Sequence, residues 1–441
     1  MKRLKSIDLL SSPIVSSLLT FALPILISNA LQQFYNAADT TIVGNFLGFN
    51  SLAAIGATSA IYELIVGFAI GIANGMGIVV ARHFGAGDIE KIKKAVAGSI
   101  VIGSVLSLAV MLVGGVWLYE LLRLVHIPEN IIDEAYSYIY IIIIFFFLTF
   151  FYNWSASMLR AIGNSLTPLL ILLVTSVINI GLDILFITRF NTGIKGAAIA
   201  TVISQAISAL LCIVYMYIKA DILIPKLKHF KYNCYVYADL STQGFAMGFM
   251  SSIVSIGTVI LQTAVNGMGV TIIAAQTTGR RIMFFLMMPM SSLATALTTF
   301  VSQNFGAGNK SRIKSAVKYA NIINTIWSMI SVVFVYTLSI PLIRFISGSY
   351  DKELIANAKL YIAMAAPFFW ALGILFDLRN ALQGMDRKIE PLISSCIELI
   401  CKIAFVLFVI PRVGYTGVVL TEPIIWVVMV LQLAYSFYIR K

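Results

Sequence analysis

The chain has 441 residues, of which 59% are hydrophobic and only 11% are charged, and its formal net charge is +12. Soluble domains carry about 25% charged residues. Because a water-soluble globule cannot bury so many apolar side chains, most of this chain must lie in lipid, and the composition excludes disordered and collagen-like proteins. The 4 cysteines and 3 histidines are scattered, so we expect neither a His/Cys metal centre nor a bound cofactor.

Twelve apolar stretches of helical length follow one another along the chain. They begin near Pro13, Leu52, Ala95, Ile131, Pro168, Gly196, Thr242, Gln276, Ala316, Leu354, Pro391 and Gly417. Most exceed the roughly 20 residues that an α-helix needs to cross a bilayer, and no β-barrel alternation occurs. The first stretch follows a basic segment and resembles a signal peptide, but its length favours a retained helix. The sequence predicts an all-α integral membrane protein with twelve transmembrane helices.

Lysine and arginine are distributed unevenly between alternate loops. One side, which includes both termini, collects 21 of the 31 basic residues, with Arg160 and Arg379 assigned to its loops, while the other side holds seven. Cytoplasmic loops of membrane proteins carry such an excess. This bias predicts a multi-pass protein of the plasma (inner) membrane with both termini in the cytoplasm. It also explains the net charge without a nucleic-acid partner.

The two halves of the sequence resemble each other at an offset of 221 residues. His83 to Gly87 (HFGAG) aligns with Asn304 to Gly308 (NFGAG), and Gly193 aligns with Gly414. Six spans in each half give both halves the same orientation, which predicts two six-helix lobes related by a pseudo-two-fold axis along the membrane normal. We expect an N-terminal lobe over 1–218, a cytoplasmic linker over 219–240 and a C-terminal lobe over 241–441. A cleft between two such lobes could open to alternate sides.

The repeated FGAG sequence lacks the GK[ST] ending of a phosphate-binding loop, and no such loop occurs elsewhere. A glycine turn between two helices is the better interpretation, with Asp88 or Asn309 capping the helix that follows. Without an ATP site, transport energy would come from an ion gradient or from the substrate's own gradient.

A polar stripe runs along the first predicted span. It consists of Ser28, Gln32, Tyr35, Asn36 and Asp39, which recur at helical spacing. Such a stripe should face a wet cavity, because polar groups in lipid are costly. Pro24 interrupts the same span and predicts a kink or hinge, since proline removes a backbone hydrogen bond.

Two further spans carry oxygen ligands. Asn179 and Asp183 share a face of the fifth span, and Thr201 adds a hydroxyl in the sixth. Together with Asp39 they offer carboxylate, amide and hydroxyl oxygens, which suit a proton or a hard cation such as Na⁺. A structural hydrogen-bond network is the alternative.

The second half does not copy this acidic site. Glu398 and Lys402 are four residues apart, and Glu422 aligns with Thr201. A structural ion pair is favoured for the first two, with a wider charge cluster as the alternative. Gln262 continues a stripe with Thr258 that we expect to line a cavity. Asp377 is expected to reach the membrane interface from near a span end.

Taken together, these motifs resemble the multidrug and toxic compound extrusion (MATE) family, over essentially the whole chain. The resemblance is carried by Pro24 and Asp39 in the first span, the two FGAG turns, the sequence LRAIGN from Leu159 to Asn164, and Asn179 with Asp183. Within the family we consider a DinF-like branch.

The resemblance implies cation-coupled efflux of organic compounds. It implies an amino-lobe cation site at Asp39, Asn179, Asp183 and Thr201, and a cavity lined by Gln32, Tyr35, Asn36 and Asn153. The acid pair that some sodium-coupled members carry on helices seven and ten is not evident, which puts carboxy-lobe coupling in doubt.

The resulting hypothesis is a monomeric antiporter in the lipid bilayer, coupled to H⁺ or Na⁺, that exports small cationic, amphipathic organic compounds. A lipid-linked oligosaccharide flippase of the same superfamily is the alternative, although it predicts a basic cleft. A membrane-embedded enzyme is a third interpretation, but no HExxH or GxSxG motif occurs.

Overall fold

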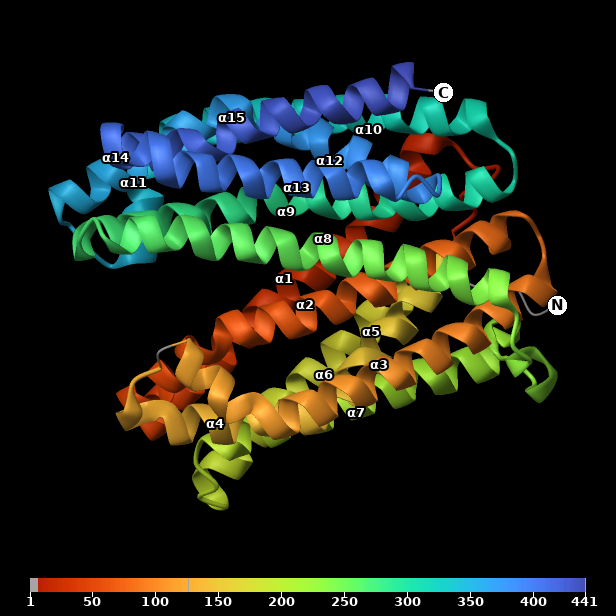
Figure 1. The fold of residues 1–441 in the computed structure, drawn as a ribbon, viewed down its shortest axis with the longest axis horizontal. Coiled ribbons are helices and arrows are strands. Elements are labelled where there is room, and N and C mark those ends of the chain that lie inside the picture. The colour runs from red at the N-terminus through yellow and green to blue at the C-terminus, as the bar shows by residue number, and fades with distance from the viewer. Residues whose placement is uncertain (1–6, 126, 441) are drawn as a thin grey trace. The chain divides into compact units, whose positions relative to one another are not determined.

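The computed structural model describes residues 7–125 and 127–440, so Lys2, Arg3, Lys5 and Lys441, which contribute to the predicted basic termini, lie outside the described residues. The helices of the first half are α1 (Ile14–Leu47), α2 (Phe49–Gly85), α3 (Ile89–Leu124), α4 (Glu129–Ile144), α5 (Phe146–Ala161), α6 (Leu166–Ile184) and α7 (Ile194–Lys219). Those of the second half are α8 (Cys234–Asn266), α9 (Val270–Gly306), α10 (Lys310–Ser347), α11 (Lys352–Ala365), α12 (Phe369–Gly384), α13 (Ile389–Ala404), α14 (Ile410–Val413) and α15 (Tyr415–Ala434). Figure 1 shows their arrangement, and no strand occurs in the described residues.

Short tight or wide helical turns extend several of these helices. The 3₁₀ turns are Asp221–Leu223, Leu227–Phe230 and Ala366–Phe368, and the π-helical turns are η1 (Leu185–Arg189), η5 (Phe405–Val409) and η6 (Tyr435–Ile439). Eleven helical stretches among the described residues are long and apolar enough to cross a membrane. A twelfth is obtained when α4 and α5 are counted as one span bent by 53°. The predicted all-α fold with twelve spans is confirmed.

The sequence repeat is reproduced in the positions of helix ends. α2 ends at Gly85 and α9 at Gly306, while α7 begins at Ile194 and α15 at Tyr415, each pair 221 residues apart. The glycines of the repeated turns adopt the same left-handed conformation, with φ of 70° at Gly87 and 75° at Gly308. A side chain with a Cβ is strained there, so both FGAG sequences end a helix as predicted.

Two compact units make up the chain. Leu23–Gly248 belong to the first, here the N-terminal unit, while Leu9–Ala22 and the residues from Phe249 onward belong to the second, here the C-terminal unit. The division falls inside α1, between Ala22 and Leu23, and inside α8, between Gly248 and Phe249. The predicted two-lobe fold is confirmed, whereas the predicted boundaries of the lobes and of the linker stay predictions.

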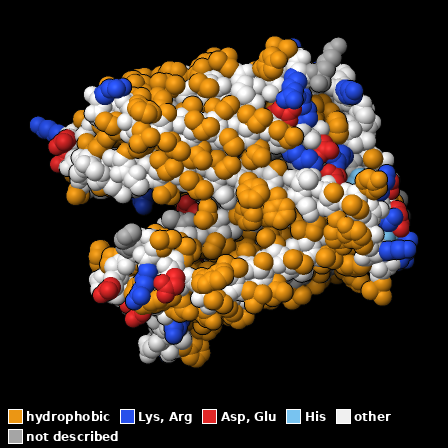
Figure 2. Space-filling view, in the orientation of Figure 1, with side chains coloured by type: hydrophobic (Ala, Val, Ile, Leu, Met, Phe, Trp, Pro, Cys, Tyr) orange, Lys and Arg blue, Asp and Glu red, His pale blue; other side chains and the backbone are white. Residues whose placement is uncertain are grey.

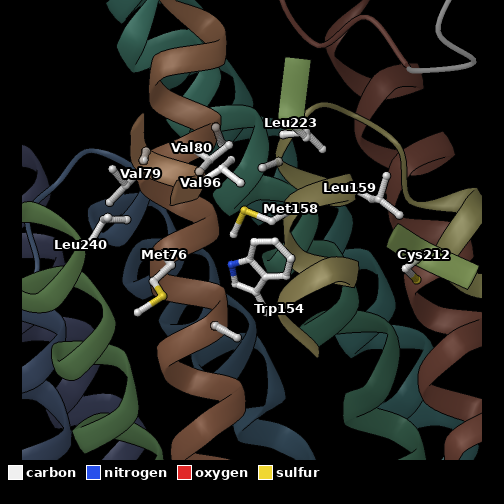
Figure 3. Close-up of a cluster of buried hydrophobic side chains, with 14 of the residues drawn as sticks. Met76, Val79, Val80, Val96, Trp154, Met158, Leu159, Cys212, Leu223 and Leu240 are labelled. Carbon is white, nitrogen blue, oxygen red and sulfur yellow. The ribbon is translucent and has the colours of Figure 1, made fainter. Parts of the chain in front are cut away.

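The core of the N-terminal unit is a dense apolar cluster between α2, α3 and α5 (Figure 3). Trp154 lies at its centre, only 3% exposed, and its indole Nε1 donates a hydrogen bond to Ser99 Oγ at 2.8 Å. Gly75 lets α2 approach the backbone of α8, because a Cβ there would lie 2.5 Å from the carbonyl oxygen of Gln243. Small residues permit such close helix crossings in membranes.

Apolar side chains also cover much of the outer surface. Large hydrophobic residues such as Val116, Leu112 and Leu210 are at least 60% exposed. In Figure 2 hydrophobic side chains extend along the helices, and charged side chains gather mostly near helix ends. A surface of this kind is stable against hydrocarbon and not against water. The chain is a multi-pass membrane protein.

The two aligned turns differ in how they begin the next helix. The Asp88 carboxylate accepts a hydrogen bond from the Lys91 backbone N–H at 3.0 Å and caps α3 as predicted. Asn309 occupies the same position before α10 but makes no side-chain cap bond, so that part of the prediction is wrong. Its amide nitrogen donates instead to Asn304 Oδ1 at 3.5 Å.

We expect Asp88→Ala to lower the free energy of unfolding by about 1 kcal/mol, because it removes an N-cap bond. The Lys91 backbone N–H holds the pKa of the Asp88 carboxyl below its ordinary value of 3.8. The cap therefore stabilises fully above pH 3.8, and this contribution is lost as the pH falls through the lowered pKa. Denaturation in detergent at several pH values measures the difference. Asn309→Ala is the matched control, and an equal loss in both variants would contradict the assignment.

Candidate functional site: two facing carboxyl groups

Asp39 of α1 and Asp183 of α6 bring their carboxyl groups together inside the N-terminal unit. The two lie within hydrogen-bonding range of each other once one of them carries a proton. Asp183 is 0% exposed. Both of its oxygens, and Oδ1 of Asp39, receive no hydrogen bond within the part of the chain that the structure describes. No lysine or arginine of the described residues forms an ion pair with either acid.

The helix α6 changes its geometry directly after Asp183. The α-helix stops at Ile184 and continues as the π-helical turn η1. Widened turns of this type are frequent at functional sites, because they redirect side chains and backbone carbonyls. Asn179 lies one turn before Asp183 on the same face, and it is 2% exposed. Both polar atoms of its amide also lack a hydrogen-bond partner in the described chain.

Thr201 belongs to α7, which packs along α6. Its side chain is buried, and Ser204, one turn further, is also buried with a hydroxyl that has no partner among the described residues. The structure records no hydrogen bond between the Thr201 hydroxyl and the two acids. The buried face of α6 and α7 therefore supplies several uncommitted oxygen atoms, but the predicted grouping of Thr201 with the acids stays a prediction.

Tyrosines surround the carboxyl pair, and two of them were missed by the sequence analysis. Tyr62 of α2 lies within electrostatic range of Asp39, and Tyr138 of α4 lies within range of both acids. Tyr62 also contacts Gln205, whose Oε1 accepts a hydrogen bond from the Thr149 hydroxyl. Tyrosine is common in apolar spans, so neither residue carried a sequence signal.

The predicted substrate residues of α1 are only partly grouped. Tyr35 packs, with Leu31, against Tyr152, Leu172 and Ala209 of the helices α5 to α7. This contact holds the middle of α1 to the N-terminal unit. Gln32 hydrogen-bonds to Tyr35, whereas Asn36 is exposed.

The remaining predicted residues of the N-terminal unit are bound locally. Asn153 donates its amide hydrogen to the Thr149 carbonyl of its own helix at 2.8 Å. Pro24 lies inside α1, which the structure assigns as one continuous helix. The roles of cavity residue and hinge for these two stay predictions.

In the C-terminal unit the ion pair predicted from the i,i+4 spacing is present, with Lys402 Nζ 2.9 Å from Glu398 Oε1. Arg379, which the sequence analysis assigned to a loop, is instead part of α12. It lies 3.7 Å from Glu398 Oε2. The loop assignment was wrong, because a buried partner lets a charged side chain remain inside a span.

Gln262 contacts Asn266 at 2.9 Å and Arg280 at 3.4 Å, and its place in a substrate cavity stays a prediction.

Asp377 contradicts a further expectation. It does not reach the membrane interface, since it is 0% exposed. The amide nitrogen of Asn324 in α10 donates to both of its oxygens, at 3.0 Å and 2.9 Å. This bidentate contact compensates for the burial of the carboxyl group, which sequence position near a helix end could not reveal.

The arrangement around Asp39 and Asp183 favours the binding of a small cation. Two unneutralised carboxylates at close range repel each other, and burial in a medium of low dielectric constant strengthens the repulsion. One proton shared between them, or one Na⁺ held by their oxygens and those of Asn179, would remove it. The described residues offer oxygen atoms here and no thiolate or imidazole.

Comparisons with known proteins agree with this architecture. The sequence matches the model of the MatE family over residues 24–185 and 246–408. It is 27% identical to the probable multidrug resistance protein YpnP of Bacillus subtilis, over 90% of this chain and 88% of that protein. It is 25% identical to the multidrug export protein MepA of Staphylococcus saprophyticus, over 92% of this chain and 90% of that protein. A solved structure of MATE in the bent conformation aligns with a TM-score of 0.89 at 23% identity, covering 98% of this chain and 96% of that one.

Asn179→Leu tests whether the polar groups of this site are kept for a ligand. Because both amide atoms of Asn179 lack partners, we expect the substitution to leave stability unchanged or to raise it, by up to about 1–3 kcal/mol. The matched control is Asn324→Leu, which leaves Asp377 buried without its donor and should destabilise by a similar amount. Denaturation in detergent without added substrate measures both. A clear loss of stability in Asn179→Leu would show that the amide is structural.

Proposed function

The chain belongs to the MatE family of membrane transporters, and from that premise we propose that it is a cation-coupled antiporter that exports organic compounds by alternating access. The relatives named as multidrug resistance and multidrug export proteins support multidrug efflux as its role. We place it in the plasma membrane as a monomer, with both termini in the cytoplasm.

One observation carries the proposal: Asp39 and Asp183 face each other in the N-terminal unit without a cationic partner in the described chain. An unpaired charge inside a membrane costs about 2.5 to 3.5 kcal/mol on insertion scales, so such groups are kept for a function. A permanent lysine or arginine partner would have made the pair structural. Its absence leaves the site free to bind an ion and to release it.

The energy of one ion is sufficient for export. An elementary charge that crosses 100 mV releases about 2.3 kcal/mol, which supports roughly a fifty-fold concentration gradient of a substrate without net charge. When a monovalent cation leaves in exchange for one monovalent ion, the two charges cancel, and the concentration gradient of the ion supplies the energy. We propose that H⁺ or Na⁺ binds at Asp39, Asn179, Asp183 and Thr201. Its inward movement is then coupled to outward movement of the substrate.

The helix α1 can connect the ion site to the conformational change. Asp39 lies beyond Pro24, on the part of α1 that belongs to the N-terminal unit, whereas Leu9–Ala22 belong to the C-terminal unit. Pro24 cannot donate a backbone hydrogen bond, so α1 bends there at low cost. We propose that ion binding at Asp39 bends α1 at Pro24. Gln32, Tyr35, Asn36, Asn153 and Gln262 are the proposed substrate residues.

The first test uses purified protein in liposomes loaded with a fluorescent lipophilic cation such as ethidium. An imposed inward proton or Na⁺ gradient should drive its export by the wild type. We expect Asp39→Asn and Asp183→Asn to reduce the rate of ethidium export to that of the passive leak, because each removes a charge that the ion neutralises. Glu63→Gln, an exposed acid of α2, is the matched control and should transport like the wild type. Export by both Asn variants at the wild-type rate would overturn the ion site.

The second test identifies the ion without any substrate. A ligand that binds only the folded protein stabilises it by about 2.7 kcal/mol at one hundred times its Kd. We expect the unfolding temperature to rise either with Na⁺ replacing choline at constant ionic strength or with falling pH. In either case Asp183→Asn should abolish the rise. If neither cation stabilises the wild type, the site does not bind the coupling ion.

A further inference from the structure

A second buried cluster of charges surrounds a cavity in the C-terminal unit. The cavity has a volume of about 180 Å³ and lies between α8, α9, α12, α13 and α15. Its charged lining residues are Arg379, Glu398, Lys402 and Glu422. Apolar and aromatic side chains form the rest of the wall, among them Met287, Phe376, Trp426 and Met429.

The charges around this cavity are not locally balanced. Glu398 is shared by Lys402, at 2.9 Å, and by Arg379, at 3.7 Å, so one carboxylate neutralises two cations. Arg379 has further contacts of 3.4 Å and 3.2 Å with the hydroxyls of Ser394 and Ser395. Its Nε is buried and has no hydrogen-bond partner among the described residues. One positive charge and the Nε donor of Arg379 are therefore without a partner on this side of the cavity.

On α15 the charge without an ion-pair partner is negative. Glu422 lines the same cavity, and no lysine or arginine of the described residues lies within ion-pair distance of it. Trp426 follows it by one helical turn, so the two side chains share a face. A carboxylate beside an indole ring is a favourable environment for an organic ammonium group, since both attract a cation.

The packing keeps this cluster in place. Gly257 of α8 leaves room for Lys402, because a Cβ at Gly257 would lie 3.0 Å from Lys402 Cδ. The cluster also occupies helices that correspond in the repeat: α13 and α15 take the places of α6 and α7, which carry Asp183 and Thr201. The second pair of helices carries Glu398, Lys402 and Glu422 at its cavity, where the first pair carries Asp183 and Thr201.

We propose that this cavity is a binding site for the head group of a zwitterionic amphiphile. An anionic group of the ligand binds between Arg379 and Lys402, where the planar guanidinium can hold a carboxylate through two hydrogen bonds. Its ammonium group binds Glu422 and Trp426, and its apolar part contacts Met287 and Phe376. The inference rests on the proposed function and names a substrate class for it.

A ligand with both charges fits better than one with a single charge. Each unbalanced charge in the cavity carries a desolvation cost that only an opposite charge relieves. A purely cationic ligand would satisfy Glu422 and leave the spare positive charge of Arg379 and Lys402. A purely anionic ligand would do the reverse.

The test compares three probes of nearly equal size by equilibrium dialysis against the full-length protein in nanodiscs of zwitterionic lipid. The probes are 3-(2-naphthyl)alanine, which carries both charges, its methyl ester, which is only cationic, and its N-acetyl derivative, which is only anionic. Empty nanodiscs correct for partition into lipid. We expect the amino acid to bind about ten-fold more tightly than either derivative, because one charged contact is worth at least about that factor.

Two charge-removing variants assign the two ends of the ligand. Glu422→Gln should reduce the affinity for naphthylalanine to that for its N-acetyl derivative. Lys402→Met should reduce it to that for the methyl ester, since Arg379 and Glu398 then form a balanced pair. The matched controls are Glu353→Gln and Lys352→Met, exposed charges in the same unit, which should bind like the wild type.

Gly257→Ala keeps every charge and makes the Lys402 side chain shift by a few tenths of an ångström, so it tests the site even if Lys402→Met does not fold. It should also weaken binding of the zwitterion. Equal affinity for naphthylalanine and its methyl ester, or wild-type affinity in the charge-removing variants, would overturn the proposal.

This binding measurement needs no ion gradient, so its result does not depend on transport. Gradient-driven export of ethidium without binding of naphthylalanine would sink this inference alone. Binding of naphthylalanine without any gradient-driven export would instead sink the proposed function.

Discussion

The N-terminal unit keeps carboxyl groups inside a membrane without a cationic partner. The electrostatic cost of doing so is the constraint on which this unit depends. Asp39 and Asp183 come from distant parts of the chain, and the polar atoms of Asn179 beside them are also unpaired among the described residues. The apolar clusters of α2 to α7 hold these groups in place, since the groups themselves contribute no stabilising contact. Buried polar groups without a partner are typical of groups that are retained for a ligand.

The internal repeat separates what the fold needs from what each half does. The helix ends and the glycine turns recur in both halves, because they determine the path of the chain. The buried charged residues do not recur. One half has two acids facing each other, whereas the other has Arg379, Glu398 and Lys402 in contact and Asp377 satisfied by Asn324. A duplicated scaffold with diverged interiors can thus assign ion binding and ligand binding to different halves.

The sequence placed Arg379 in a loop and Asp377 near a span end, positions from which a charged side chain usually reaches water. In the structure both residues lie within α12. Both are buried because partners on other helices, Glu398 and Asn324, reach them. Asn309 fails to cap α10 for a similar reason, since its amide turns toward Asn304. Tyr62 and Tyr138 were missed because nothing in their local sequence distinguishes them from tyrosines that pack helices.

Hydrophobicity and glycine placement in the sequence alone determined the twelve helical spans and the turns of the repeat, because the length of an apolar stretch and the conformation of a glycine are local properties. The rarity of intramembrane acids also singled out Asp39 and Asp183. Only the tertiary structure decided which buried groups are neutralised. Whether a charge has a partner depends on side chains that the fold brings together from distant helices, and helical periodicity does not encode those distances.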